Sequence, residues 1–351
     1  MESTNVTVPV VPATLPVIDI SPLTKSSSSS ADAEAAALQK VVDELREACL
    51  RFGFFYIKNH GIDENLIARL FAEGKRFFGE CPHDKKESIH MRNNAVFRGW
   101  FELQGEYTSK KKDFKEGLYF GAELGDDAEE VKAKLPMHGR NQWPDPELFP
   151  GFDKLIIDYM DALTELGHQV MRGIALSLNL SENYFREQFT SSPFTPFRLF
   201  YYPADPLPRE EQWGVGQHTD YGVLTILGQD DVGGLEVLTK DGQWIAAPPI
   251  PGTFVVNIGD MLETWTCGLY KATPHRVKNS SAVDRLSAPF FFDPNFKCLV
   301  SPLEHCRREL EAKGQVAAEP REPILYGRYI LNKVLANFPE LQKDALTEIS
   351  P

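Results

Sequence analysis

The sequence contains few cysteines, and their spacing excludes two common kinds of scaffold. Its 351 residues include five, namely Cys49, Cys81, Cys267, Cys298 and Cys306. No two of them form a Cys-x-x-Cys pair, and an odd number suits neither a disulfide framework nor a structural zinc site. We therefore expect free thiols and a cytoplasmic location.

Long apolar runs are also missing. No stretch approaches the roughly 20 apolar residues that a membrane-spanning helix needs. The first residues carry no basic segment, and Pro9, Pro12 and Pro16 interrupt their apolar stretch. No secretory signal is recognisable in such a pattern. We expect no membrane partner.

Positive charge is scarce. Lys and Arg total 37 against 50 Asp and Glu, which gives a net charge of −13. Nucleic-acid binding depends on clustered cations, so this balance argues against a nucleic-acid partner. The dense basic run from Lys110 to Lys112 is interrupted by Asp113 and followed by Lys115. We interpret this run as a solvated face.

The sequence does contain enough apolar residues for a large core. Hydrophobic residues make up 42% and charged residues 25% of the chain, as is usual for a globular protein. We recognise no internal repeat and no long linker. We expect a mobile arm over residues 1–14, a region of helices and strands over 15–150, and a second region over 151–351. These regions should form one compact unit, with a serine-rich loop at 25–30.

Apolar periodicity predicts the main helices. Residues spaced by three and four positions predict helices over 33–52, 63–81, 152–178, 304–312 and 322–338. Asp63 is the expected N-cap of the second helix, and Ser181 that of a short helix ending near Phe189. Residues 82–150 are expected to be irregular and rich in aromatic side chains.

The segment from His218 to Ser287 is rich in strand signals. Its β-branched and aromatic runs are separated by Gly233-Gly234, Asp241-Gly242 and Pro251-Gly252. This pattern predicts antiparallel strands in a small sheet or barrel. The runs are 223–227, 235–238, 244–246 and 254–258, and further strands are expected over 16–20, 54–58 and 197–203.

The same segment carries a candidate metal site. His218 and Asp220 are two residues apart, so in a strand their side chains point to one face. His275 comes from a later segment and completes a set of two histidines and one carboxylate, which we call the triad. Such a triad is the ligand set of non-haem Fe(II) oxygenases, although zinc would suit the same ligands. Arg285 and Ser287 again share a face, and an arginine beside a hydroxyl is a good clamp for a carboxylate.

The triad with Arg285-x-Ser287 resembles the signature of the plant-type 2-oxoglutarate- and Fe(II)-dependent oxygenases, the superfamily of isopenicillin N synthase. The resemblance covers nearly the whole chain and includes Leu15 to Ile20 and Gly53 to Gly61. Other segments, such as Asp293 to Phe296, are most similar to the branch with the ethylene-forming enzyme, thymine hydroxylase and homoarginine-type hydroxylases. The implied fold is α+β with a mostly β core, namely a double-stranded β-helix, or jelly roll, flanked by N-terminal and C-terminal helices.

The resemblance also implies cofactors and the roles of particular residues. The triad would bind Fe(II), and Arg285 and Ser287 would hold the C5 carboxylate of 2-oxoglutarate with a hydrogen bond from Tyr202. O2 would be the oxidant, and ascorbate would stimulate turnover. The implied activity is that of a dioxygenase that hydroxylates, or otherwise oxidises, a small organic metabolite with release of succinate and CO2.

Four residues are candidates for contacts with the substrate. Arg198 alternates with Phe200 and Tyr202 in one strand, so it either reaches the pocket or forms an ion pair on the outer face. Phe200 stands where many members have Asn, which makes the pocket more apolar. Tyr119 and Phe292 are the remaining candidates. Relatives act on amino acids, nucleobases, indoles and alkaloids, and these residues favour none of them.

Two other functions remain open. One is an Fe(II) oxidase of the same fold that does not use 2-oxoglutarate, because isopenicillin N synthase and aminocyclopropane-carboxylate oxidase keep the Arg-x-Ser pair. The other is a catalytically silent metal-binding scaffold, which an intact triad disfavours. A monomer is the expected oligomeric state.

Overall fold

The computed structural model describes residues 14–24, 30–205, 212–278, 282–314 and 322–339. The expected arm over residues 1–14 and the expected serine-rich loop over 25–30 therefore lie, apart from Thr14 and Ser30, outside the described residues.

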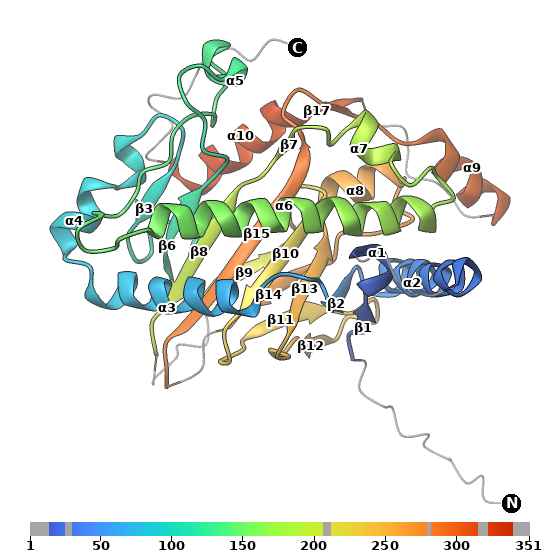
Figure 1. Ribbon diagram of the computed structural model, residues 1–351, viewed down its shortest axis with the longest axis horizontal. Helices are drawn as coiled ribbons and strands as arrows, with labels where there is room; N and C mark the ends of the chain where they lie inside the picture. The colour runs from blue at the N-terminus through green and yellow to red at the C-terminus, as the bar shows by residue number, and fades with distance from the viewer. Residues whose placement is uncertain (1–13, 25–29, 206–211, 279–281, 315–321, 340–351) are drawn as a thin grey trace, which may run out of the picture.

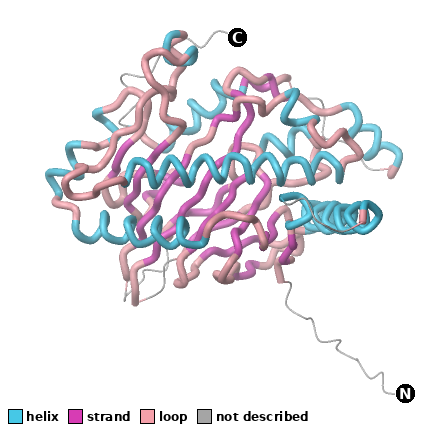
Figure 2. The backbone as a smooth tube through the Cα atoms, viewed as in Figure 1, coloured by secondary structure: helices cyan, strands magenta, loops and turns pink. Residues whose placement is uncertain are grey.

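Two sheets form the core of the molecule (Figures 1 and 2). In the order of pairing, the larger sheet contains β1 (Val17–Asp19), β2 (Phe54–Lys58), β13 (Thr253–Ile258), β10 (Leu224–Gln229), β15 (Arg285–Asn295), β8 (Phe197–Tyr202), β6 (Glu116–Phe120) and β3 (Gly99–Phe101), with β7 (Pro193–Phe194) beside β15. The smaller sheet contains β12 (Trp244–Ala246), β11 (Leu235–Leu238), β14 (His275–Val277) and β9 (Val215–His218). The α+β jelly roll that the sequence predicts is confirmed.

The strand predictions succeed where turn residues bound short apolar runs. β2, β11 and β12 have the predicted bounds, and β10 and β13 differ from them by one or two residues. β1 is parallel to β2, whereas the other pairs within the two sheets are antiparallel. Both predicted regions of the chain contribute strands to the larger sheet.

Helices cover the outer face of the larger sheet. The long helix α6 (Phe152–Ser177) crosses the strands, with α3 (Glu64–Glu80) beside it and α2 (Ala31–Arg51) near the N-terminal strands (Figure 1). The apolar stripe of α6 is buried, as its periodicity predicts. Asp63 caps α3 by accepting a hydrogen bond from the backbone N–H of Asn65, also as predicted.

The remaining helices are shorter. They are α1 (Ser21–Thr24), α4 (His83–Ser88), α5 (Glu129–Lys132), α7 (Tyr184–Gln188), α8 (Asp260–Trp265), α9 (Glu304–Ala312) and α10 (Tyr326–Asn337), with a 3-10 turn at Met91–Asn93. The bounds of α9 are those predicted.

Three expectations about local structure are wrong. Residues 82–150 are not wholly irregular, because β3 and β6 extend the larger sheet and β4 (Tyr107–Thr108) pairs with β5 (Lys111–Lys112) in a hairpin. Ser181 does not cap α7, since the residue before its first turn is Asn183. The last helix begins at Tyr326, because β17 (Ile324–Leu325) pairs with β16 (Leu299–Val300) instead of joining the helix.

The interpretation of the basic run is also partly wrong. Lys110 to Lys112 are exposed as expected, but Asp113 and Lys115 are each only 1% exposed. They form a buried ion pair with each other. Polarity alone does not distinguish a solvated charge from a paired, buried one.

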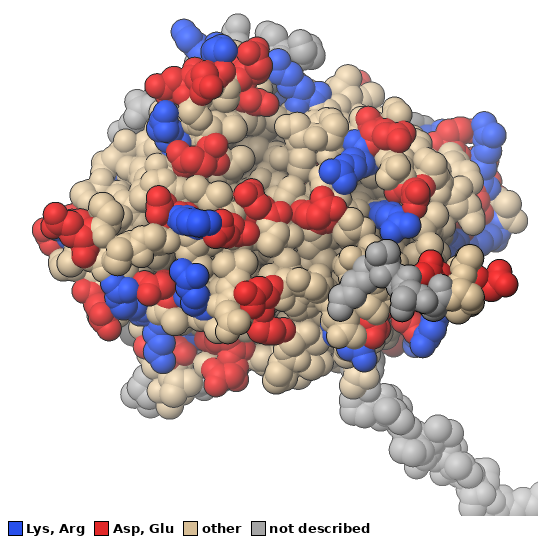
Figure 3. Space-filling view, viewed as in Figure 1, with Lys and Arg blue, Asp and Glu red and all other residues tan. Residues whose placement is uncertain are grey.

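The surface agrees with the composition. Acidic and basic side chains are interspersed over the face drawn in Figure 3. The five cysteines are free, as predicted. Among the helices of the described residues, none is both long and apolar enough to cross a membrane.

Candidate active site

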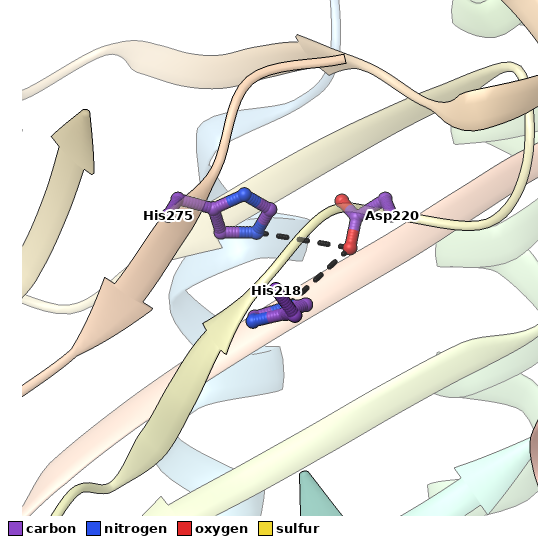
Figure 4. A group of neighbouring side chains, drawn as sticks. All are labelled: His218, Asp220 and His275. Atoms are coloured by element: carbon purple, nitrogen blue, oxygen red, sulfur yellow. Dashed lines mark ion pairs between the residues drawn. The ribbon is translucent and has the colours of Figure 1, made fainter. Parts of the chain in front are cut away.

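The structure brings the three triad residues together at one end of the smaller sheet (Figure 4). His218 ends β9, His275 begins β14, and the antiparallel register places these two residues opposite each other. Asp220 lies on the loop after β9. Its Oδ1 is 3.6 Å from Nε2 of His218 and 3.7 Å from Nε2 of His275. One ligand atom from each residue therefore faces a common point, with all three within 4.8 Å of one another.

Backbone carbonyls orient both imidazole rings. Nδ1 of His218 lies 2.8 Å from the carbonyl oxygen of Gly216, and Nδ1 of His275 lies 3.1 Å from that of Thr273. A carbonyl can only accept, so each Nδ1 carries the proton and donates it. Each Nε2 is thereby left with a lone pair that points into the triad, as a metal ligand requires.

Two side chains orient the carboxylate of Asp220 by hydrogen bonds to one of its oxygens. Its Oδ2 accepts hydrogen bonds from Thr225 and, at 2.7 Å, from Nδ2 of Asn257. These two bonds leave Oδ1 free to face the histidines. The following loop is tight, because a Cβ on Gly222 would lie 1.4 Å from Oδ1 of Asp293. A glycine is therefore required beside this carboxylate ligand.

The electrostatics of the triad favour a cation. Burial by itself raises the pKa of Asp220, but the two histidines and the hydrogen bonds from Asn257 and Thr225 bring that pKa below its usual value. Burial lowers the pKa of His275, and His218 lowers it further. A charged carboxylate beside a neutral imidazole is the protonation state that binds a divalent metal. The donor set of two imidazole nitrogens and one carboxylate oxygen thus fits Fe(II).

A second cluster lies in the same cavity. Arg285 and Ser287 project from β15, and Tyr202 projects from the paired position on β8. Arg285 is 1% exposed, yet its Nε and Nη1 have no hydrogen-bond partner among the described residues. Its Nη2 donates to Oε1 of Gln229 at 3.2 Å, and the hydroxyls of Ser287 and Tyr202 are 3.4 Å apart. A buried guanidinium with unused donors, beside two hydroxyls, fits the carboxylate of a ligand.

A single cavity joins the two clusters. Its walls are partly apolar, with Phe200, Leu227 and Leu235 among the lining side chains. Such a mixture of apolar walls and a few convergent polar groups is typical of a small-molecule site.

The candidate substrate residues lie in different places. Arg198 and Phe200 line the cavity. Tyr119 does not line the cavity. The centroid of its ring lies 4.1 Å from Cζ of Arg198, so Tyr119 contacts the guanidinium through a cation–π interaction. The expectation for Phe292 is wrong, because its ring packs on Gly167 and His168 of α6. Phe291, on the opposite face of β15, lines the cavity instead.

Sequence reasoning missed a buried ionic network beside the triad. Oε2 of Glu106 lies 2.8 Å from Nζ of Lys115, which also pairs with Asp113. Oε1 of Glu106 accepts a hydrogen bond from the hydroxyl of Tyr119 and lies 3.4 Å from Nη1 of Arg198. Glu106 and Lys115 both line the cavity. The only sequence signal was the alternation of Asp113 with Lys115, which puts both on one face of an extended segment.

Fold, triad and arginine clamp define a class: a non-haem metal oxygenase with a jelly-roll core. Comparison with known proteins gives the family. Residues 15–146 match the N-terminal family model of the non-haem dioxygenases in morphine synthesis, and residues 193–294 match that of the 2OG-Fe(II) oxygenase superfamily. The chain belongs to the 2OG-Fe(II) oxygenase superfamily and is an Fe(II)- and 2-oxoglutarate-dependent oxidoreductase.

Individual relatives agree with this assignment. A probable iron/ascorbate oxidoreductase of Dictyostelium discoideum is 44% identical, over 95% of this chain and 97% of its own. A homoarginine-6-hydroxylase of Oryza sativa subsp. japonica is 40% identical, over 92% and 97%. The solved structure of full-length Neurospora crassa T7H in complex with alpha-KG is similar with a TM-score of 0.76, at 27% identity over 92% of this chain and 96% of that one. The branch that the sequence resembles is confirmed.

Proposed function

We propose that the triad holds Fe(II) and that Arg285, with Ser287 and Tyr202, holds the distal carboxylate of 2-oxoglutarate. One observation carries this assignment of roles. Two buried donors of Arg285 lack a partner among the described residues, and Arg285 lines the same cavity as the three triad residues. A dicarboxylic co-substrate that reaches from the metal to Arg285 would satisfy both ends.

The bound metal and co-substrate supply the oxidising chemistry, in which 2-oxoglutarate is converted to succinate and CO2 while O2 oxidises a C–H group of the substrate. The protein orients the reactants. The backbone carbonyls behind His218 and His275 fix the imidazole rings, and Thr225 and Asn257 fix the carboxylate of Asp220. The apolar side chains in the wall of the cavity would reduce the access of water to the reacting groups.

We further propose a free amino acid as the class of substrate. The support is the 40% identity to a relative named homoarginine-6-hydroxylase. Arg198 and Phe200 would contact this substrate directly, and Tyr119 would act through Arg198. We also retain, as predictions, a monomer in the cytoplasm without a nucleic-acid or membrane partner.

The test is an activity screen. Purified protein with Fe(II), ascorbate and 2-oxoglutarate is incubated in air with L-homoarginine and other free amino acids, and succinate is measured. We expect one amino acid to stimulate succinate formation and its oxidised product to appear in equal amount. Asp220→Ala should abolish both, because a divalent metal held by two neutral histidines alone is bound weakly.

Two results would overturn parts of this proposal. Iron-dependent oxidation of a substrate without consumption of 2-oxoglutarate would favour the oxidase. Full activity in Asp220→Ala would remove the triad from its proposed role.

A further inference from the structure

The cavity contains a second arginine with unused hydrogen-bond donors. Arg198 projects from β8, and its Nε is inaccessible to solvent and has no hydrogen-bond partner among the described residues. Its contact to Glu106, at 3.4 Å, is long for a charge-assisted hydrogen bond. A buried donor that makes no hydrogen bond costs roughly 1–3 kcal/mol, so such a group calls for an explanation.

Aromatic rings restrict how a ligand can approach this guanidinium. Its Cζ lies 4.1 Å from the ring centroid of Tyr119 and 5.0 Å from that of Phe291. Cation–π contacts of this kind hold the guanidinium plane in place. With rings against its faces, the guanidinium can pair with a carboxylate only along its edge, through two parallel hydrogen bonds.

The neighbouring acid does not fill this edge. Glu106 is 2% exposed, and its oxygens are engaged by Lys115 and by the hydroxyl of Tyr119. Lys115 is shared in turn with Asp113. The network therefore holds two acids and two bases, so its charges balance before a ligand arrives. Arg198 is positioned by this network but keeps donors that the network does not use.

The co-substrate does not account for Arg198. Tyr202 faces Arg285 across the β8–β15 pair, and Arg198 lies four residues before Tyr202 on the same strand. At about 3.4 Å per residue, the backbones of Arg198 and Arg285 are separated by roughly 14 Å along the strand direction. Arg198 is therefore too far along the strand to share the distal carboxylate that we assign to Arg285.

We propose that Arg198 binds a carboxylate of the organic substrate, which makes the substrate a carboxylic acid. This inference rests on the proposed function, because it assumes that 2-oxoglutarate occupies Arg285. It also gives a separate physical reason for the amino-acid class, since the α-carboxylate of an amino acid would form the bidentate pair with Arg198.

The test uses the whole protein, loaded with Fe(II) and 2-oxoglutarate under anaerobic conditions. The probes are three pairs in which only the carboxylate differs, namely L-arginine with agmatine, L-leucine with 3-methylbutylamine, and L-phenylalanine with 2-phenylethylamine. Binding is measured by calorimetry and by perturbation of the visible absorption band of the loaded metal. We expect at least one acid to bind at least tenfold more tightly than its amine.

The variants isolate the guanidinium. Arg198→Gln should erase the preference for the acid while the visible band remains. Arg198→Lys should keep part of the preference, because lysine retains the positive charge but lacks the planar donors that form two parallel hydrogen bonds to a carboxylate. Arg76→Gln is the matched control, since Arg76 also stacks on an aromatic ring, that of Phe149, and pairs with an acid, Glu73, but lies on α3 outside the cavity. It should behave like the unchanged protein.

Each other outcome overturns the inference. If the unchanged protein prefers no acid, or if Arg198→Gln and Arg198→Lys keep the full preference, Arg198 does not bind a substrate carboxylate. If Arg198→Gln loses the visible band but remains folded, Arg198 serves the co-substrate. If the band does not form even in the unchanged protein, the proposed function itself fails, and this inference fails with it.

Discussion

Replacement of Arg285 by methionine should affect binding and stability in opposite directions. In the protein without ligand, Arg285 is a buried cation with two nitrogens that lack partners among the described residues. Methionine removes the cost of burying those donors. It also removes the 3.2 Å hydrogen bond to Gln229 and the contact with the ring of Tyr202, 4.8 Å from the guanidinium. Because replacing a buried charge by an apolar side chain is often neutral or stabilising, we expect the free energy of unfolding to stay unchanged or rise by about 1–2 kcal/mol.

The same change should severely weaken binding of 2-oxoglutarate. Removing one partner of a buried, hydrogen-bonded charge pair costs about 2–5 kcal/mol, which corresponds to roughly 30-fold to several-thousand-fold in affinity. The affinity is measured by anaerobic calorimetry with the Fe(II)-loaded protein, and the stability by urea denaturation of the metal-free protein. A loss of several kcal/mol in stability with normal affinity for 2-oxoglutarate would refute the reasoning, because Arg285 would then be a structural residue.

Three further changes test other parts of the site. Asn257→Leu removes the hydrogen bond that Asn257 donates to Oδ2 of Asp220 and should weaken Fe(II) binding about 10- to 100-fold in a metal titration. Unchanged affinity would show that this contact does not orient the carboxylate. Burial raises the pKa of Asp293 from 3.8 to about 7. Between these two pH values the folded protein keeps a proton on Asp293 that the unfolded chain has lost. The free energy of unfolding should therefore fall as the pH rises from about 4 to 7. Asp293→Asn should remove this loss, which amounts to at most about 4 kcal/mol, in urea denaturation of the metal-free protein at both ends of that range; an identical pH dependence in the variant would contradict the assignment. Lys115→Met leaves two buried carboxylates without their shared cation and should lower the free energy of unfolding by about 3–5 kcal/mol; a loss below about 1 kcal/mol would mean that the network is not held by charge.

The strands and the triad were accessible from the sequence because their signals are local. Turn residues bound β11 and β12, and the spacing of His218 and Asp220 puts both on one face wherever the segment is extended. His275 comes from a distant segment, and its assignment as the third ligand was supported by the resemblance to a known family. The structure adds the register that places His275 opposite His218.

The miss in the basic run has a physical cause, which is that burial of a charged side chain depends on its partners. Lys115 and Asp113 read as solvated residues, yet their mutual pairing allows both to be buried. The wrong prediction for Phe292 has a different cause, because it overlooked the alternation of side chains between the two faces of β15. Arg285 and Ser287 define the inner face of β15, and the same alternation indicates Phe291 rather than Phe292.

The central claim is that the triad and Arg285 together hold Fe(II) and 2-oxoglutarate. The most direct measurement adds Fe(II) and then 2-oxoglutarate to the purified protein without oxygen and records the visible charge-transfer band of the chelated metal. We predict that the band appears in the unchanged protein, that Arg285→Met needs a 2-oxoglutarate concentration about 30-fold higher or more to form it, and that it is absent in His218→Ala. Tight iron binding without any band on addition of 2-oxoglutarate, or a normal band in His218→Ala, would contradict the account.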